Sequence, residues 1–258
     1  MLAYTLRSRE QMRRVLRSLG CSPMVFSTFG ELEATGARAA NFDVLFLGDV
    51  PDMDSEGNAP LASASAITGR GVPILHVPMH RAPRPPRRGE AADGLAAPRF
   101  FGELYLTMLS FLVANGFRCA EPRLAWGVYA FDPVDLSCHI GNERIQLDPV
   151  AFDVALELFF NAGEMVSRKW LRRMLPSGER GAIWHRIDNI GCTVEDLCVA
   201  IRLNEANGWV LDEMGLEGYR LHRVRATGTP HPAPSAPERP PKPPKPPNAN
   251  RRRMEPTP

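Results

Sequence analysis

The apolar residues of the first hundred positions follow two alternating patterns. Short apolar runs have the length and composition of buried strands, and they lie at residues 2–6, 23–27, 44–47, 72–77 and, more weakly, 95–97. Helical segments are predicted between and after these runs, at residues 8–19, 28–40, 61–68 and 100–115. In the first of them Ser8 is the expected N-cap. Repeated strand–helix units predict an α/β domain with a doubly wound parallel sheet and helices on both faces.

A different pattern begins near residue 124. Short strand-like runs separated by turn signals lie at residues 124–131, 137–140, 144–147, 209–213 and 219–223. Asp148 can cap a helix that starts at Pro149 and ends before Gly163. Two further helices are predicted at residues 168–175, capped by Ser167, and at residues 193–205. Strands, three helices and a terminal hairpin predict an α+β winged-helix domain.

Composition divides the chain into three parts. A proline-basic segment interrupts the pattern at residues 81–88, and a short polar connection covers residues 118–124. From about Arg225 onward, proline, basic and small residues dominate. We therefore expect one domain at residues 1–118 and a second at residues 119–224, followed by a disordered tail at residues 225–258. The tail has too few large apolar side chains to offset the entropy of ordering.

Bulk properties argue against several classes of protein. The formal net charge is only +2, so an electrostatic argument depends on where the charges lie. There is no membrane-length apolar run and no signal-peptide pattern, so a cytoplasmic protein without a membrane partner is expected. The five cysteines show no zinc-ligand spacing, and neither a metal nor a cofactor is predicted. The sequence has no nucleophile–base constellation or phosphate loop, which argues against an enzyme.

Three motifs of the second domain resemble the winged helix of OmpR/PhoB-type response regulators. Residues 145–158, IQLDPVAFDVALEL, are similar to the strand and first helix of that domain. Residues 163–171, GEMVSRKWL, are similar to the turn into its second helix, and residues 218–221, GYRL, to its closing strand. The motifs occur in the family's order. The resemblance implies a transcription regulator that binds double-stranded DNA.

The first domain resembles the receiver domain of the same family, which is doubly wound and flavodoxin-like. Residues 42–47 are similar to the third strand of a receiver, residues 72–75 to the fourth and residues 91–98 to the segment around the fifth. The two resemblances together cover residues 1–224.

The matching positions lack the groups that receiver phosphorylation needs. That chemistry uses acidic Mg²⁺ ligands after the first strand, an aspartate at the end of the third, a hydroxyl and a lysine. Here these positions hold, in the same order, Leu6 and Arg7, Gly48, Pro78 and Ala97. Asp49 follows Gly48, but neighbouring strand residues point to opposite faces. We therefore predict a degenerate receiver with no conventional phosphorylation, and Asp49 is an unfavourable candidate.

The resemblance places the DNA contacts on the second and third helices and on the hairpin. The candidate contact residues are Arg168, Lys169, Arg172 and Arg173 on the second helix, Arg186 in the connection after it, Thr193, Arg202 and Asn204 on the third helix, and Arg220 on the hairpin. The third helix should enter the major groove. It offers few donors and carries the acidic residues Glu195, Asp196 and Glu205.

Two functions remain open. The first is a DNA-binding regulator of the response-regulator type. Its candidate protein partners are a second copy, meeting through the receiver-like domain, and RNA polymerase or another regulator. The second is a protein-interaction module that keeps the winged-helix scaffold but has lost sequence-specific reading, as the arginine-poor third helix suggests. A continuous positive surface over the second and third helices favours DNA, and a broken or negative one favours a protein partner.

Overall fold

A computed structural model describes residues 1–51, 57–69, 71–78, 100–121, 124–174 and 190–224. The predicted fifth strand, the connection that holds Arg186 and the proline-rich tail lie outside these residues. Residues Met1–Arg225 belong to one compact unit. Within the described ranges no helix has the length and apolar character needed to span a membrane.

A short parallel sheet forms the centre of the N-terminal part, residues 1–121. β1 (Leu45–Leu47) pairs with β2 (Ile74–His76), and Leu2 bridges both Phe26 and Leu47 in parallel. The backbone order is therefore Phe26, Leu2, β1, β2, which is the 2-1-3-4 order of a doubly wound sheet. This order agrees with the predicted fold class.

The first two predicted strands are reduced to single bridges. Leu2 donates to the carbonyl of Phe46 at 2.8 Å, and Ala3 donates to the carbonyl of Phe26 at 3.1 Å. The chain then leaves the sheet, because Thr5 caps α1 (Leu6–Ser18) by accepting from the N–H of Ser8. The prediction that Ser8 is the cap was wrong, since this residue lies inside the first turn.

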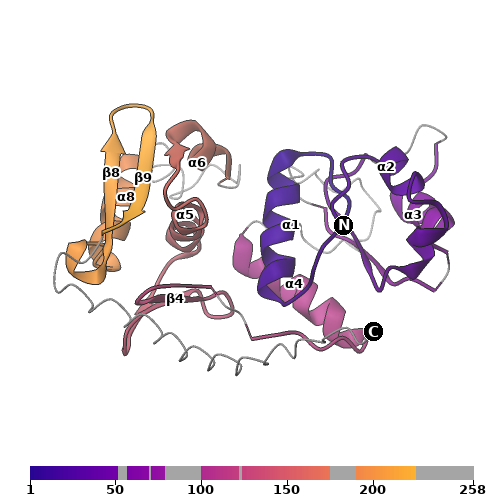
Figure 1. Cartoon of the computed structure of the whole chain (residues 1–258), viewed down its shortest axis with the longest axis horizontal. Coiled ribbons are helices and arrows are strands. Elements are labelled where there is room, and N and C mark those ends of the chain that lie inside the picture. Colours follow the sequence, from indigo (N-terminus) through magenta and orange to yellow (C-terminus); the bar gives the residue numbers. More distant parts are fainter. Residues whose placement is uncertain (52–56, 70, 79–99, 122–123, 175–189, 225–258) are drawn as a thin grey trace, which may run out of the picture. The chain divides into compact units, whose positions relative to one another are not determined.

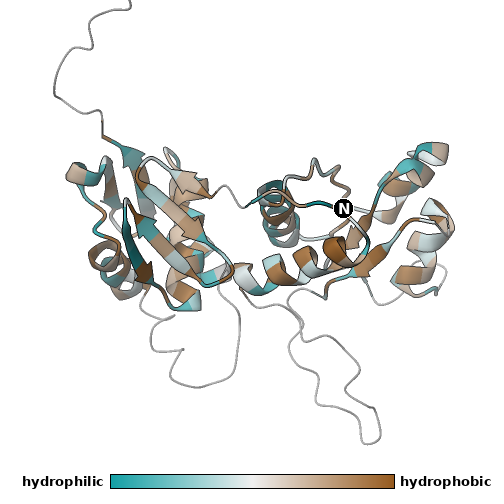
Figure 2. Cartoon of the chain, turned by 90° about the horizontal axis from the view of Figure 1, so that it is seen from below, coloured by the Kyte–Doolittle hydropathy of each residue, from teal (hydrophilic) through white to brown (hydrophobic). Residues whose placement is uncertain are grey.

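Helices cover both faces of this sheet (Figure 1). α1 and α4 (Phe101–Ala114) pack on the face to which Phe46 points, whereas Leu45 and Leu47 point to the opposite face. That second face holds α2 (Phe29–Glu33) and α3 (Pro60–Thr68). The alternation follows from the two-residue period of a strand. α4 carries one charged residue, Glu103, and is apolar along most of its length (Figure 2).

The predicted helix at residues 28–40 is divided in two. α2 ends at Glu33, and a 3₁₀ helix, η1 (Gly36–Asn41), follows it. Gly36 has a φ of +56°, a left-handed conformation that a glycine adopts without steric cost and that an α-helix cannot contain. The glycine therefore separates the two segments.

The C-terminal part, residues 124–224, begins with a four-stranded antiparallel sheet. Its strands, in spatial order, are β3 (Ala125–Trp126), β4 (Tyr129–Asp132), β5 (Ser137–Ile140) and β6 (Glu143–Gln146). A turn at Gly127, with a φ of +65°, divides the strand predicted at residues 124–131 into β3 and β4. Asp148 caps α5 (Pro149–Phe160) as predicted, since its carboxylate accepts from the N–H groups of Val150 and Ala151.

A second sheet and two more helices complete the C-terminal part. The remaining elements are β7 (Met165–Ser167), α6 (Arg168–Met174), α8 (Ile190–Ala200), the 3₁₀ helix η2 (Glu205–Asn207), β8 (Trp209–Met214) and β9 (Gly218–Arg223). The three strands are ordered β7-β9-β8, and β8 and β9 form the terminal hairpin. The helix predicted at residues 193–205 starts three residues earlier and ends at Ala200. The element order agrees with a winged helix.

α5 lies at the centre of the C-terminal part because its aromatic residues contact both sheets. The ring centroid of Phe159 lies 5.2 Å from that of Tyr129, and 5.4 Å from those of Trp126 and Trp209. These two tryptophans thus pack against the core helix. The same cluster continues into α1 and α4, so the two predicted domains share one apolar core.

Gly102 marks the closest approach between α4 and the C-terminal part. A Cβ atom at this position would lie 2.6 Å from Cδ2 of Leu136 and 2.8 Å from the carbonyl oxygen of Pro133. Both distances are far shorter than ordinary van der Waals contact. The backbone of α4 can therefore lie against the β4–β5 turn only because residue 102 has no side chain.

We predict that Gly102→Ala lowers the free energy of unfolding by about 1–3 kcal/mol, because the added methyl group overpacks this contact. Gly30→Ala is the matched control, since it is also a helical glycine and a Cβ there meets only Oγ1 of Thr28 at 3.9 Å. Urea denaturation of both variants checks the prediction. Equal stability of the two variants would contradict it.

Candidate nucleic-acid interface

The first cation of α6 is engaged inside the fold. The guanidinium of Arg168 pairs with the carboxylate of Glu213 on β8 and lies over the ring of Tyr219, 4.8 Å from its centroid. Only 20% of the Arg168 side chain is exposed. An arginine held in this way contributes little free positive charge to a surface that would face a phosphate backbone.

Two other cations of α6 face solvent. Lys169 and Arg172 are exposed and lie three positions apart, hence on neighbouring parts of one helical face. Arg173 belongs to α6, but its side chain lies outside the described part of the structure, as does the whole of Arg186. α6 therefore presents at least two cations to a ligand.

α8, which would enter the major groove, has an exposed face without cations. Its exposed residues are Cys192, Glu195, Asp196, Val199 and Ala200. Val199 is 79% exposed, and no Lys, Arg or His occurs between Ile190 and Ala200. Base edges are read by side-chain hydrogen-bond donors and by cations, and the described face of α8 offers carboxylates and apolar groups instead.

The predicted contact residue Thr193 does not reach this face. Its exposed fraction is 7%, and it lies on the buried side of α8 together with Val194 and Leu197. The helical period explains the correction, because these residues belong to the stripe that packs on α5. Thr193 therefore stabilises the position of α8 and is not available to a base edge.

Arg202 and Asn204 lie beyond the end of α8 and make internal contacts. Arg202, with a φ of +46°, donates to both carboxylate oxygens of Glu143 at 2.7 and 2.8 Å. Asn204 caps η2 by accepting from the N–H of Asn207 at 3.1 Å. The Arg202–Glu143 pair is more than half exposed on the arginine side, so it contributes little to stability and can exchange for another anion.

The hairpin contributes charges of both signs. Arg220 is exposed and lies opposite Asp212 in the β8–β9 register. Counted over the described side chains of α6, α8 and the hairpin at residues 209–223, with His222 taken as neutral, the cations are Arg168, Lys169, Arg172, Arg220 and Arg223, and the anions are Glu195, Asp196, Asp212, Glu213 and Glu217. The five cations equal the five anions, so these side chains provide no excess of positive charge for DNA.

Gly48, which the sequence resemblance aligns with the phosphoacceptor of a receiver, has no space for a side chain. A Cβ atom on Gly48 would lie 2.8 Å from both Cβ of Ala3 and Sδ of Met12. Asp49 is engaged elsewhere, because its two carboxylate oxygens accept from the N–H of Thr5 at 3.2 and 3.1 Å. No cluster of three metal-ligating side chains occurs among the described residues.

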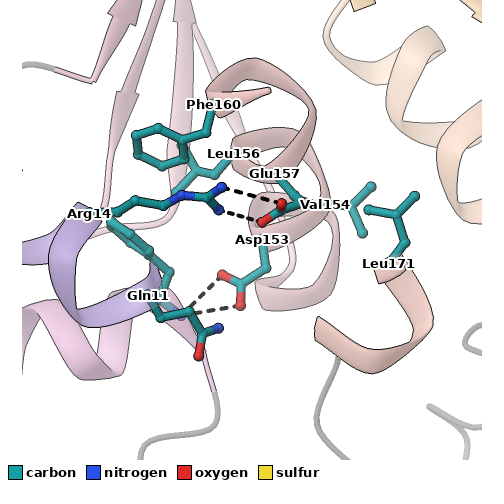
Figure 3. Close-up of a pocket in the computed structure, with 9 residues that line it drawn as sticks. Gln11, Arg14, Asp153, Val154, Leu156, Glu157, Phe160 and Leu171 are labelled. Carbon is teal, nitrogen blue, oxygen red and sulfur yellow. Dashed lines mark hydrogen bonds and ion pairs between the residues drawn. The ribbon is translucent and has the colours of Figure 1, made fainter. Parts of the chain in front are cut away.

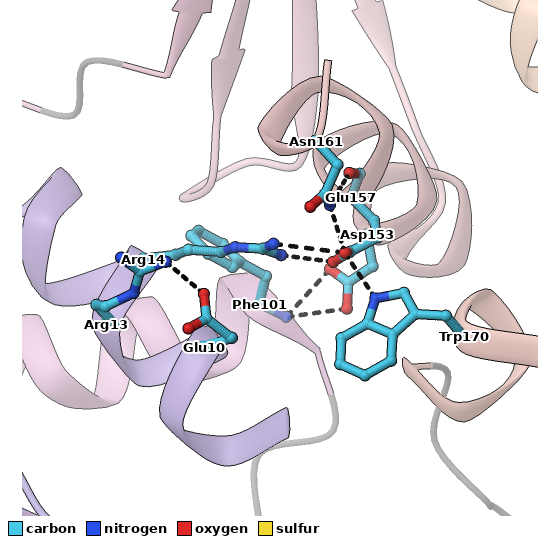
Figure 4. A network of polar contacts seen from close by, with 8 residues as sticks. All are labelled: Glu10, Arg13, Arg14, Phe101, Asp153, Glu157, Asn161 and Trp170. Carbon is cyan, nitrogen blue, oxygen red and sulfur yellow. Dashed lines mark hydrogen bonds and ion pairs between the residues drawn. The ribbon is translucent and has the colours of Figure 1, made fainter. Parts of the chain in front are cut away.

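Sequence analysis missed a buried polar network that joins the two parts of the chain. Glu157 of α5 pairs with Arg14 of α1 at 2.5 Å, and these side chains are only 4% and 11% exposed. The indole N–H of Trp170 on α6 donates to Glu157 at 2.8 Å, and the amide of Asn161 donates to it at 2.7 Å. Figure 4 shows the three donors converging on this carboxylate.

A second buried carboxylate lies beside the first. Both oxygens of Asp153 accept from the N–H of Phe101, at 3.1 and 3.2 Å, and so cap the first turn of α4. Burial raises the pKa of Asp153 to about 8, although the Phe101 N–H and the charge of Arg7 oppose the shift. Burial also lowers the pKa of Arg7 to about 10. The sequence does contain a sign of this network, because Asp153 and Glu157 are the two acidic residues of an otherwise apolar helix.

Comparisons with known proteins give weak matches. No family model matches the sequence, and neither does a curated protein. Among solved structures, the Klebsiella pneumoniae RstA DNA-binding domain in complex with the RstA box is 22% identical. The match covers 38% of this chain and 94% of that chain, with a TM-score of 0.31. The Thermotoga maritima response regulator DrrB, an OmpR/PhoB homolog, is 16% identical and covers 86% of this chain and 98% of that chain, with a TM-score of 0.33.

The raised pKa of Asp153 predicts a pH-dependent stability. Because the folded state holds this proton to about pH 8 whereas the unfolded state loses it near pH 4, the contribution of Asp153 is present at low pH and is lost as pH rises between those values. Asp153→Asn keeps an oxygen that can accept from Phe101, and should remove this part of the pH dependence. Urea denaturation from pH 4 to pH 9 measures it.

The matched control is Asp196→Asn, which changes an exposed residue of α8 and should keep the wild-type profile. Identical pH profiles of the wild type and Asp153→Asn would show that the buried carboxylate does not act as described.

Proposed function

We propose that the chain is a transcription regulator of the response-regulator type that works without aspartate phosphorylation. The 2-1-3-4 backbone order of the N-terminal part and the three helices with a terminal hairpin in the C-terminal part support the proposal. So do the three motifs that resemble OmpR/PhoB-type regulators. The packing of Gly48 against Ala3 and Met12 supports the loss of phosphorylation.

The proposed ligand is double-stranded DNA, bound mainly through its phosphates. Lys169 and Arg172 on α6, and Arg220 on the hairpin, are exposed cations on elements that flank the duplex in this fold. The exposed face of α8 carries Glu195, Asp196 and Val199, so base reading by this helix would be poor. The expected binding is therefore weakly selective and strongly dependent on salt.

A second candidate function is a protein-interaction module on the same scaffold. The observation that favours it is the α8 face, where Val199 is 79% exposed between acidic residues. The balance of charge over the described side chains of α6, α8 and the hairpin points the same way. A second copy of this chain, meeting through its N-terminal part, and RNA polymerase or another regulator are the proposed protein partners.

Fluorescence anisotropy with a pool of duplexes over a range of salt concentrations distinguishes the two functions. Arg172→Ala and Arg220→Ala should each weaken binding and reduce the log–log salt slope by about 1, because each removes one phosphate contact. Arg13→Ala, on α1, is the matched control and should bind as the wild type does. Failure of the wild type to bind any duplex at low salt would exclude DNA and leave the protein-interaction function.

Incubation with acetyl phosphate and Mg²⁺ should leave the chain unmodified, because Asp49 is engaged by Thr5 and the neighbouring position is glycine. Intact-mass spectrometry checks this outcome. A phosphorylatable receiver treated in parallel controls for the reagent. A phosphate adduct mapped to Asp49 would refute the proposed loss of phosphorylation.

A further inference from the structure

One buried carboxylate connects three helices. Glu157 belongs to α5, and it accepts hydrogen bonds from Arg14 of α1 and from Trp170 of α6. Figure 3 shows the guanidinium of Arg14 reaching Glu157 beside Phe160, and the Arg14 guanidinium carbon lies 4.7 Å from the centroid of that ring. Leu171, the next residue of α6, lines the same small pocket as Gln11 and Arg14. Glu157 therefore binds side chains of both α1 and α6, beside a pocket that the two helices also line.

The energetics of this site make its three bonds interdependent. A carboxylate that is 4% exposed is stable as an anion only while cations and donors surround it. If Arg14 is removed, Glu157 must regain water or another donor, and the nearby donors Trp170 and Asn161 are already bound to it. Arg14 and Asn161 also line a pocket between α1 and α5, so water that reaches Glu157 from this side after the loss of the guanidinium competes with the Trp170 bond.

α6 also packs against β7, α8 and β9, and the N–H of Arg168 donates to the carbonyl of Glu217 at 2.9 Å. Its first turn is capped by Ser167, which accepts from the N–H of Trp170 at 3.1 Å, and Arg168 pairs with Glu213. The Arg168–Glu213 pair is exposed on the glutamate side, where 59% of the side chain faces solvent, so solvent screens it. Among the described side-chain hydrogen bonds of α6, the bond from Trp170 to Glu157 is the one that reaches α5.

We propose that Glu157 is a positioning residue through which α1 fixes the orientation of α6. In this arrangement the N-terminal part sets the position of the helix that carries Lys169 and Arg172 by a permanent buried ion pair, where a phosphorylated receiver would use a switch. The consequence for DNA binding rests on the proposed function, but the coupling between the helices does not.

Hydrogen–deuterium exchange of the full chain tests the coupling. Arg14→Ala should speed exchange of the amides of residues 168–174 by about tenfold or more, although Arg14 makes its hydrogen bonds to α5 and none of the described ones to α6. Arg13→Ala is the matched control, because Arg13 is the next residue of the same helix and pairs with Glu10 at the surface. It should leave α6 protected.

Conservative variants separate positioning from general destabilisation. Arg14→Lys keeps the cation and should restore most of the protection of α6. Glu157→Gln keeps an oxygen for Trp170 but loses the charge, and should give an intermediate rate; it also serves if Arg14→Ala does not fold. Faster exchange confined to α1 and α5, with α6 unchanged, would overturn the proposal.

Duplex affinity measured on the same proteins distinguishes the proposed coupling between the helices from the proposed DNA-binding function. If Arg14→Ala both speeds amide exchange in α6 and weakens duplex binding, both proposals are supported. If Arg14→Ala speeds amide exchange in α6 but the wild type binds no duplex, the coupling is supported and the DNA function is overturned. Unchanged protection of α6 overturns the coupling, whatever the affinity for DNA.

Discussion

The buried ion pair between Arg14 and Glu157 is the constraint that joins α1 to α5, on a carboxylate that also binds Trp170 of α6. Breaking a buried pair by removing one partner typically costs about 3–5 kcal/mol, because the remaining charge loses its compensation. α5 carries this charge on one side and the aromatic cluster around Phe159 on the other. One helix thus organises both the contact with α1 and the core of the C-terminal part.

The apolar surroundings explain why the contact is specific. Phe101 lies 6.1 Å from Phe160 between ring centroids, and Gly102 lets α4 approach the β4–β5 turn. Apolar packing alone would allow these surfaces to slide, since the hydrophobic effect has no direction. The bonds from Arg14 to Glu157 and from Phe101 to Asp153 have fixed geometry and therefore define one register.

Local patterns were sufficient to predict most elements of the fold. The cap at Asp148, the apolar stripe of α5 and the hairpin strands depend on neighbours a few residues away, and these were found from the sequence. Strand lengths near the N-terminus were overestimated, because pairing in a parallel sheet is decided by distant segments. The left-handed conformation of Gly36, just after the end of α2, shows why the helix predicted at residues 28–40 does not continue as one α-helix.

The candidate site could be predicted only as a set of residues. Helical spacing places Thr193 on the buried stripe once the true start of α8 is known, but that start was misplaced by three residues. Sequence spacing cannot show that Arg168 meets a carboxylate 45 residues away, or Arg202 one 59 residues away. Whether a cation is free to bind a ligand is a property of the tertiary structure.

The packing around Gly48 bears on which residues this position can accept. An aspartate there would need space now filled by the side chains of Ala3 and Met12, one on the first bridged segment and one on α1. Any side chain at position 48 would have to be matched by smaller residues at positions 3 and 12. Tight packing thus couples these three positions and limits the single substitutions that each of them tolerates.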